Sequence, residues 1–151
     1  MTLTQRESDH LQDLIKQENL CIEKYGKAAG EACDPQLKDL LNALGDNERE
    51  HRDTLNQLSC GCVPDVSGGG HRAQTIMPTA SAVEDSAGRQ CDKHLCADLL
   101  QTEKHASSMF DNSVFEFSDV GARTALNHMQ KEEQEHGQKL YSYMQQNGMS
   151  S

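Results

Sequence analysis

Residues 48–51 and 133–136 each begin with a glutamate and end with a histidine, and a further glutamate stands 30 residues before the glutamate of each pair. Residues three apart lie on the same face of a helix, so the carboxylate and the imidazole of each pair can converge on one ion. Four carboxylates and two imidazoles match the known ligand set of helical bundles that hold two iron or two manganese ions. The spacing therefore predicts a two-metal site formed by Glu18, Glu48, His51, Glu103, Glu133 and His136.

These six residues are interleaved with apolar residues at helical spacing. Glu18 stands between Leu14 and Ile22, and the other five are flanked in the same way. The pattern predicts that all six side chains point into the core. A buried carboxylate without a partner is costly or has a raised pKa, so four of them need cations or protons nearby. Two divalent ions would balance the four negative charges.

A single Glu-x-x-His is a weak signal, because the chain has 24 acidic residues and most such pairs lie on solvated helix faces. We assign Glu23, Glu50, Glu132 and Glu135 to such faces. Two copies at equal spacing on apolar stripes favour the metal site over chance. A bundle whose core carboxylates are protonated or hydrogen-bonded, and which holds no metal, remains an open alternative.

Other side chains near these motifs are more ambiguous. Tyr25 follows Glu18 by two helical turns, where its phenol can reach the site or pack in the core. Because Phe110 holds the matching place in the second half of the chain, we favour packing. The remaining histidines are expected at the surface or around the ligands, rather than among them: His10, His71, His94, His105 and His128.

Helices are the elements that must position these residues. Thr4 and Glu7 form a capping-box pattern, and apolar residues follow at helical spacing. Asp34 and Pro35 start a second helix, as N-cap and first helical residue. A third pattern begins near Cys91. The predicted elements are a helix pair at about 4–58, a crossover loop rich in Gly, Pro and Ser at about 59–89, and a helix pair at about 90–147.

The second helix pair repeats the first. Sliding residues 97–142 over residues 12–57, by 85 positions without a gap, aligns both glutamate and histidine sets and several other identical residues. An internal repeat of a helical hairpin is the simplest interpretation. The chain is thus predicted to be a single all-α domain over residues 1–151, an antiparallel four-helix bundle of two repeated hairpins joined by a long crossover.

Composition excludes several classes of function. The formal net charge of -10 and the pI near 5.0 argue against binding to nucleic acid, which needs clustered Lys and Arg. No apolar run is long enough to span a bilayer and no signal-peptide region is present, so we expect no membrane contact and synthesis in the cytoplasm.

The cysteines are expected to be mainly reduced, and Cys60-Gly-Cys62 lacks the second pair that a rubredoxin or zinc-ribbon site needs. The six are Cys21, Cys33, Cys60, Cys62, Cys91 and Cys96.

Two family resemblances rest on these motifs. GDNEREH at 45–51 and KEEQEH at 131–136 resemble the metal-binding helices of rubrerythrin and the wider ferritin-like superfamily. LLQTEKHASSMFDNSVFEFSD at 99–119 and MQKEEQEHGQKLYSYMQQNGM at 129–149 resemble the spore coat protein F family of endospore-forming bacteria. Together the resemblances cover about residues 5–58 and 90–149.

The first resemblance implies a ferritin-like bundle with a di-iron centre that reduces peroxide or oxidises ferrous iron. It implies that Glu48 and Glu133 bridge the two ions, that Glu18 and Glu103 are terminal ligands, and that His51 and His136 each bind one ion. The second implies a place in the spore coat and says nothing of catalysis. Because rubredoxin-type cysteines are missing, electrons would come from a separate donor.

We therefore expect a di-metal carboxylate protein of the coat F type, redox-active toward dioxygen or peroxide. Iron is the expected metal pair, with manganese as the alternative and zinc as an adventitious occupant. The alternative function is a structural coat or assembly protein without turnover, and iron storage is weaker because no cage-forming surface is evident. The expected partners are other spore coat components and an external electron donor; a homodimer is common among bundles, although no sequence feature demands one.

Overall fold

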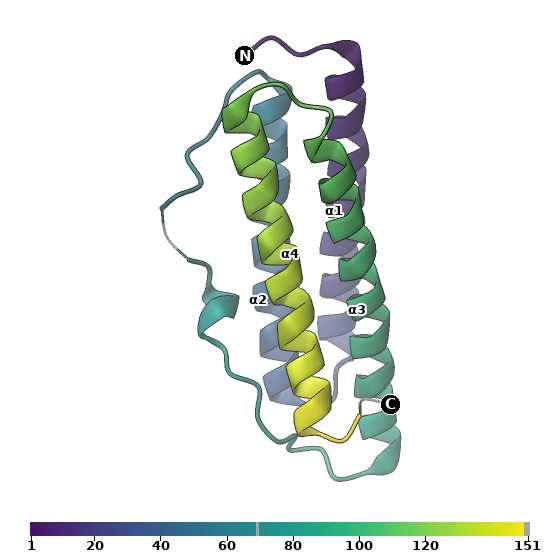
Figure 1. The fold of residues 1–151 in the computed structure, drawn as a ribbon. Helices are drawn as coiled ribbons and strands as arrows, with labels where there is room; N and C mark the ends of the chain where they lie inside the picture. Colours follow the sequence, from purple (N-terminus) through teal and green to yellow (C-terminus); the bar gives the residue numbers. More distant parts are fainter. Residues whose placement is uncertain (69, 150–151) are drawn as a thin grey trace.

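Four long helices and one 3₁₀ turn make up the computed structural model, which describes residues 1–68 and 70–149. The described residues form no strand. The predicted all-α bundle of paired hairpins is confirmed (Figure 1). The helices are α1 (Gln5–Glu31), α2 (Pro35–Ser59), α3 (Ser86–Val114) and α4 (Val120–Gln146), and the 3₁₀ helix η1 covers Arg72–Thr75.

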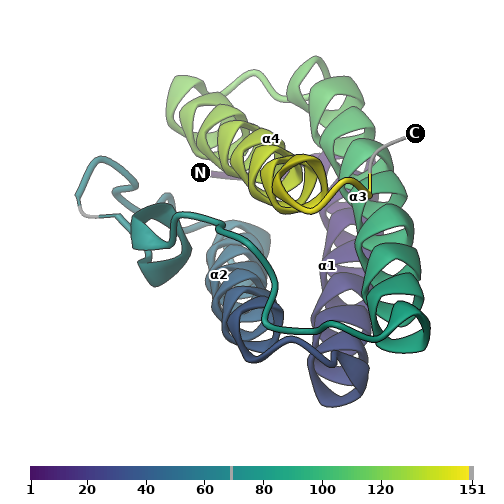
Figure 2. The same cartoon turned by 90° about the horizontal axis from the view of Figure 1, so that it is seen from below.

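The four helices form two hairpins that pack side by side. α1 pairs with α2 and α3 pairs with α4, while α1 also contacts α3 and α2 contacts α4. Seen along the bundle, the helices stand at the corners of a four-sided array, with η1 outside it beside α2 (Figure 2). The described part of the crossover, residues 60–68 and 70–85, runs from one end of the bundle to the other beside α2 (Figure 1).

Polar caps set the ends of the helices. The Thr4 hydroxyl accepts the Glu7 N–H at 3.1 Å and the Glu7 carboxylate accepts the Thr4 N–H at 2.8 Å, which confirms the capping box. α3 begins at Ser86, earlier than the predicted start near residue 90. Asp85 caps it by accepting the Gly88 N–H at 2.7 Å, and the polar first turn has no apolar period that would reveal it.

Two separate apolar clusters fill the bundle. Both are built from residues of all four helices. On α2, for example, Leu44 belongs to one cluster and Leu55 to the other, so the Glu48 to His51 stretch lies between them. The first cluster includes Tyr25, Leu37, Leu40, Leu41, Leu44, Leu99, Leu140 and Tyr143, and the second includes Leu11, Leu14, Leu55, Leu58, Phe110, Phe117, Leu126 and Met129.

Hydrogen bonds join the turn between α1 and α2 to the second hairpin. Asp92 of α3 accepts the backbone N–H groups of Cys33 at 2.8 Å and Asp34 at 3.0 Å. Asp34 caps α2 by accepting the Gln36 N–H at 3.2 Å, and it accepts the phenol of Tyr143 on α4 at 2.7 Å. Burial alone would raise the pKa of Asp34, but the hydrogen bonds from Tyr143 and Gln36 outweigh burial and lower it.

Two further observations concern membrane-spanning helices and the state of the cysteines. Among the described residues, no helix is both long enough and apolar enough to cross a membrane. All six cysteines are free thiols; Cys21 and Cys96 are buried, and burial raises the pKa of Cys96 to about 12.

Asp34→Ala should lower the free energy of unfolding by about 1–2 kcal/mol, because it removes the N-cap of α2 and the acceptor of Tyr143. The pKa of Asp34 is lower in the folded chain than in the unfolded chain, so its contribution is complete above about pH 4 and is lost as the pH falls through the folded value. Urea unfolding of both proteins at neutral and at acid pH measures the effect. Asp13→Ala, at an exposed position of α1, is the control, and a difference that does not shrink in acid would contradict the assignment.

Candidate metal centre

All six predicted ligands lie in one buried layer. Glu18 comes from α1, Glu48 and His51 from α2, Glu103 from α3, and Glu133 and His136 from α4. None is more than 2% exposed. This burial agrees with the prediction from the apolar stripes around these residues. The layer also separates the two apolar clusters.

The six side chains divide into two groups that share two members. Within each group, one potential ligand atom from every residue lies within 4.8 Å of the others. Glu48 and Glu133 belong to both groups, so each lies between two candidate ion positions. The first group is Glu18, Glu48, His51 and Glu133, and the second is Glu48, Glu103, Glu133 and His136.

Each imidazole turns its Nδ1 atom to a glutamate of the other hairpin. His51 Nδ1 lies 2.8 Å from Glu133 Oε1, and His136 Nδ1 lies 2.7 Å from Glu48 Oε1. The glutamate three residues earlier on the same helix lies at 3.8 Å and 3.7 Å, respectively. The two rings stack with centroids 5.7 Å apart and planes at 11°. Both hairpins therefore contribute to each candidate ion position.

Several carboxylate oxygens in this layer lack hydrogen bonds. Both oxygens of Glu18, and Oε2 of Glu48, Glu103 and Glu133, have no hydrogen-bond partner among the described residues, whereas Glu48 Oε1 has His136 Nδ1 at 2.7 Å. Leaving such atoms buried and unpaired is costly, and charged ones most of all. Oxygen atoms that converge without donors suit hard or borderline divalent cations, so the residues fit a pair of metal ions.

Without bound metal ions, the buried carboxyl and imidazole groups are expected to hold protons that offset the negative charge. Burial, followed by neighbouring carboxylates, raises the pKa values of Glu18 and Glu133 well above the usual range. Burial would raise the pKa of Glu48 as well, but contacts with Glu18 and His136 outweigh it and hold this pKa well below the usual range. Carboxylate neighbours overcome burial at both histidines, raising the pKa of His51 well above its usual value and that of His136 to about 10.

A second layer of residues fixes the orientation of both imidazoles. His51 Nε2 lies 3.0 Å from Glu132 Oε1, and His136 Nε2 lies 2.6 Å from Asn47 Oδ1. With Nε2–H donated outward, Nδ1 is the ring nitrogen that faces the glutamates, where a metal ion would take the place of its proton. Metal-binding histidines are commonly held in this way, by an acceptor on the other ring nitrogen. Asn47 and Glu132 occupy equivalent places in the repeat, each one residue before its Glu-x-x-His.

The assignment of Glu132 to a solvated face is wrong. Glu132 is 6% exposed and lies 3.0 Å from His51 Nε2, 3.3 Å from His128 Nε2 and 3.4 Å from His71 Nε2. Burial opposes ionisation, but His51 and the other two imidazoles lower the pKa of Glu132 to about 2. The repeat aligns Glu132 with Asn47, another polar residue, so the sequence carried no signal for this burial. By contrast, Glu23 and Glu50 are exposed, as predicted.

The preference for simple packing of Tyr25 is also wrong. Its ring is fully buried, yet its hydroxyl donates a hydrogen bond to Glu103 Oε1, so the phenol reaches the site as the alternative proposed. Burial and the Glu103 carboxylate raise the pKa of Tyr25 well above its usual value. Phe110, at the matching position of the second half, packs edge-on against His51 with centroids 6.3 Å apart.

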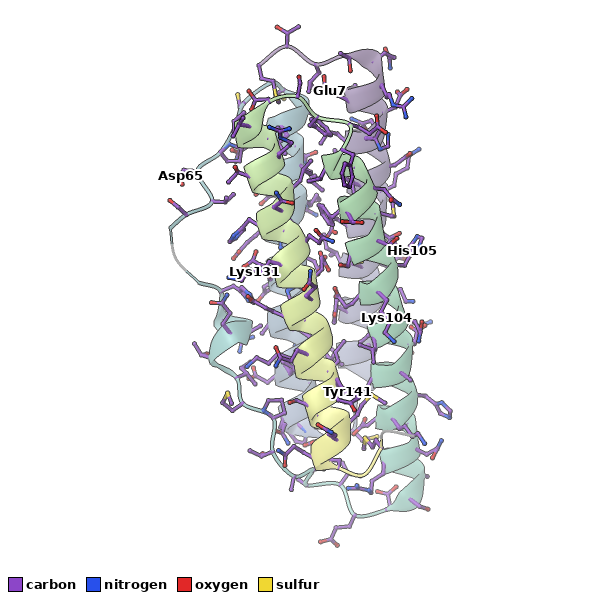
Figure 3. All side chains as sticks on the ribbon, viewed as in Figure 1. Glu7, Asp65, Lys104, His105, Lys131 and Tyr141 are labelled. Carbon is purple, nitrogen blue, oxygen red and sulfur yellow. The ribbon has the colours of Figure 1, made fainter. Side chains whose placement is uncertain are left out.

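The other histidines divide between the surface and the neighbourhood of the ligands. His94 and His105 are exposed, and His105 points outward from α3 beside Lys104 (Figure 3). His10 is half-buried and contacts Ser113 at 3.3 Å. His71 is buried, with its ring edge-on to that of His136 at 5.6 Å.

A cavity of about 720 Å³ opens between α3 and α4. Glu103 and Glu133 lie in its wall, together with Leu100, Gly137 and Tyr141. Two of the six candidate ligands therefore border a space that small molecules can enter.

Asn47→Ala should weaken binding at one of the two ion positions by about 10- to 100-fold, because the His136 imidazole loses the acceptor that orients it. Asn47→Asp keeps an oxygen acceptor, as Glu132 does in the other half, and should retain most of the affinity. Titration of the metal-free chain with Mn²⁺ measures the effect. Asn42→Ala, at an exposed position of the same helix, is the control; unchanged Mn²⁺ binding by Asn47→Ala would rule out this orienting role.

Comparison with known proteins bears on the second hairpin. Residues 91–151 match the Coat F domain family. No curated protein matches the chain. The matched segment holds Glu103, Glu133 and His136, whereas the resemblance to the ferritin-like superfamily stays a prediction. The second hairpin is therefore similar to the Coat F domain, in line with the second resemblance drawn from its sequence.

Proposed function

We propose that this chain is a spore coat protein of the Coat F type whose single domain, residues 1–151, is a ferritin-like bundle that binds two divalent metal ions. One observation carries the proposal. Both buried imidazoles turn Nδ1 toward a carboxylate of the other hairpin, in a layer where further carboxylate oxygens lack donors, while an outer acceptor holds each Nε2. That orientation is the one required for histidine ligands, and it recurs in both halves of the repeat.

The ligand roles follow from the shared members of the two groups. Glu48 and Glu133 would bridge the ions, Glu18 and Glu103 would each bind one of them, and one imidazole would complete each position. Two divalent ions would neutralise four carboxylates. Oxygen-rich ligands with one imidazole per ion suit iron or manganese, and zinc could enter adventitiously. An iron or manganese pair supplies the capacity for two-electron reactions with dioxygen or peroxide.

The chain's own residues would support such chemistry in two ways. The cavity between α3 and α4 leads small molecules to the wall formed by Glu103 and Glu133. The phenol of Tyr25 donates to Glu103 and is positioned to hold a proton beside that carboxylate. Electrons would come from an external donor, and other coat components or a second copy of the chain would be its partners.

A structural role without turnover is the alternative, and the site's place between the hairpins favours it. Each candidate ion position draws on both hairpins, so bound ions would brace one hairpin against the other. In this alternative the metal contributes stability alone. Breaking a buried charge cluster by removing one member would still be destabilising.

The chain purified from cells supplemented with iron or manganese should carry about two ions more than the Glu48→Ala/Glu133→Ala variant, because the variant loses both shared carboxylates. Elemental analysis of the two proteins measures the difference. Glu23→Ala/Glu31→Ala, at two exposed positions of α1, is the matched control and should keep the wild-type content. Equal metal content in all three proteins, or no bound metal in any of them, would contradict the two-metal proposal.

The iron-loaded chain should consume hydrogen peroxide when a reductant is supplied, and Gly137→Leu should slow this reaction severalfold at unchanged iron content, because the new side chain fills the cavity. Gly137→Ala is the control, since a Cβ at this position would lie 3.5 Å from Leu100 Cδ1, an ordinary contact. Peroxide loss and absorbance of the iron centre are the measurements. A loaded protein that responds to neither peroxide nor dioxygen supports the structural alternative.

A further inference from the structure

A third group of ligand-type side chains lies outside the six candidate ligands. It consists of His71 from the crossover and of Glu132 and Glu135 from α4, with potential ligand atoms within 4.8 Å of one another. His71 Nε2 lies 3.4 Å from Glu132 Oε2 and 3.8 Å from Glu135 Oε2. Glu132 and Glu135 are three residues apart, so both carboxylates leave the same face of the helix.

The His71 imidazole is the unusual member of this group. Its side chain is only 4% exposed, and neither ring nitrogen has a hydrogen-bond partner among the described residues. A buried polar group without a partner is costly, and the crossover nevertheless places this ring against two carboxylates. A cation between the three side chains would satisfy the imidazole and both acidic groups.

The distances suit a metal ion. Ligand atoms about 2.1 Å from a tetrahedral ion lie about 3.4 Å from one another. The two separations at His71 Nε2 are close to this value, so small side-chain shifts would complete the site. Imidazole nitrogen and carboxylate oxygen are both ligands of Zn²⁺ and Fe²⁺, and water can occupy the remaining position.

The surrounding contacts hold the crossover in place over α4. Gln74 Nε2 donates to Glu135 Oε2 at 3.1 Å, and Lys139 Nζ donates to the carbonyl oxygens of Gln74 at 3.3 Å and of Ile76 at 2.7 Å. These bonds fasten η1 to α4 on the C-terminal side of His71. The imidazole is therefore positioned before any ion arrives, which reduces the ordering cost of binding.

An entry path reaches the group from solvent. A cavity of about 140 Å³ is lined by exposed acidic side chains and by three imidazoles. Its wall includes Glu50, Asp65, His51, His71, His128 and Glu132. Glu132 lies between the His71 group and the two-metal layer, since its Oε2 faces His71 and its Oε1 faces His51.

We propose that His71 Nε2, Glu132 Oε2 and Glu135 Oε2 form a third divalent-cation site, distinct from the two-metal centre. It binds one transition-metal ion near the middle of α4 and fastens the crossover to the bundle. Glu132 would bind this ion through Oε2 while its Oε1 faces His51, so the third site lies next to the two-metal centre. The third site does not depend on occupation of the proposed two-metal centre.

Zn²⁺ titration of the metal-free full chain by calorimetry tests this site. His71→Ala and Glu135→Gln should each remove one Zn²⁺ equivalent or weaken it at least tenfold. His94→Ala and Glu23→Gln change exposed residues of the same types and are the matched controls. Thermal unfolding in chelator checks that every variant remains folded, and Glu135→Gln, at a half-buried position, keeps the test valid if His71→Ala loosens the crossover.

The Glu48→Ala/Glu133→Ala background separates the third site from the two-metal centre. This variant should retain one Zn²⁺ per chain, and adding His71→Ala should abolish it. That result would support the third site even if the wild-type chain bound no further ions and the two-metal proposal failed. Equal Zn²⁺ binding with and without His71→Ala and Glu135→Gln, in both backgrounds, would overturn the third site.

Discussion

Four carboxylates and two imidazoles buried between two apolar clusters set the conditions for the rest of this bundle. The apolar clusters alone would permit the hairpins to slide or rotate against each other, because leucine contacts are not directional. The polar layer permits one arrangement, in which each imidazole meets the opposite hairpin's glutamate within 3 Å. Displacing one hairpin would leave several charges buried without partners, at a cost comparable to a whole domain's net stability.

The internal repeat makes this arrangement nearly symmetric, but the outer acceptors of the two imidazoles differ. Asn47 and Glu132 both accept a hydrogen bond from a histidine of the other hairpin, but only Glu132 carries a charge. A carboxylate makes the His51 imidazole a stronger donor to a metal than an amide makes His136. The two candidate ion positions are therefore not equivalent, and the one beside His51 should bind more tightly.

The sequence predicted the helices, the hairpin repeat and the six residues of the buried layer. These features could be predicted because helical periodicity depends on one helix at a time, and the shift of 85 positions compares the two hairpins directly. It failed where burial depends on contacts between elements. Glu132 is adjacent to Glu133 and lies to one side of the apolar stripe, and only the crossover and His51 cover it. Tyr25 was correctly placed on the core face, but whether its hydroxyl meets a carboxylate depends on α3. His71 lies in a segment without periodicity, so its burial left no trace in the pattern.

The long crossover has a consequence for the order of folding. Contacts within each hairpin are local in sequence, whereas the contacts between hairpins close a loop that includes the whole crossover, so we expect the hairpins to form first and to dock afterwards. Neither hairpin alone holds a complete set of ligands for either position of the two-metal centre. Ion capture at that centre is then coupled to docking, and a newly made chain would pass through a period in which paired helices exist but the centre cannot yet retain metal.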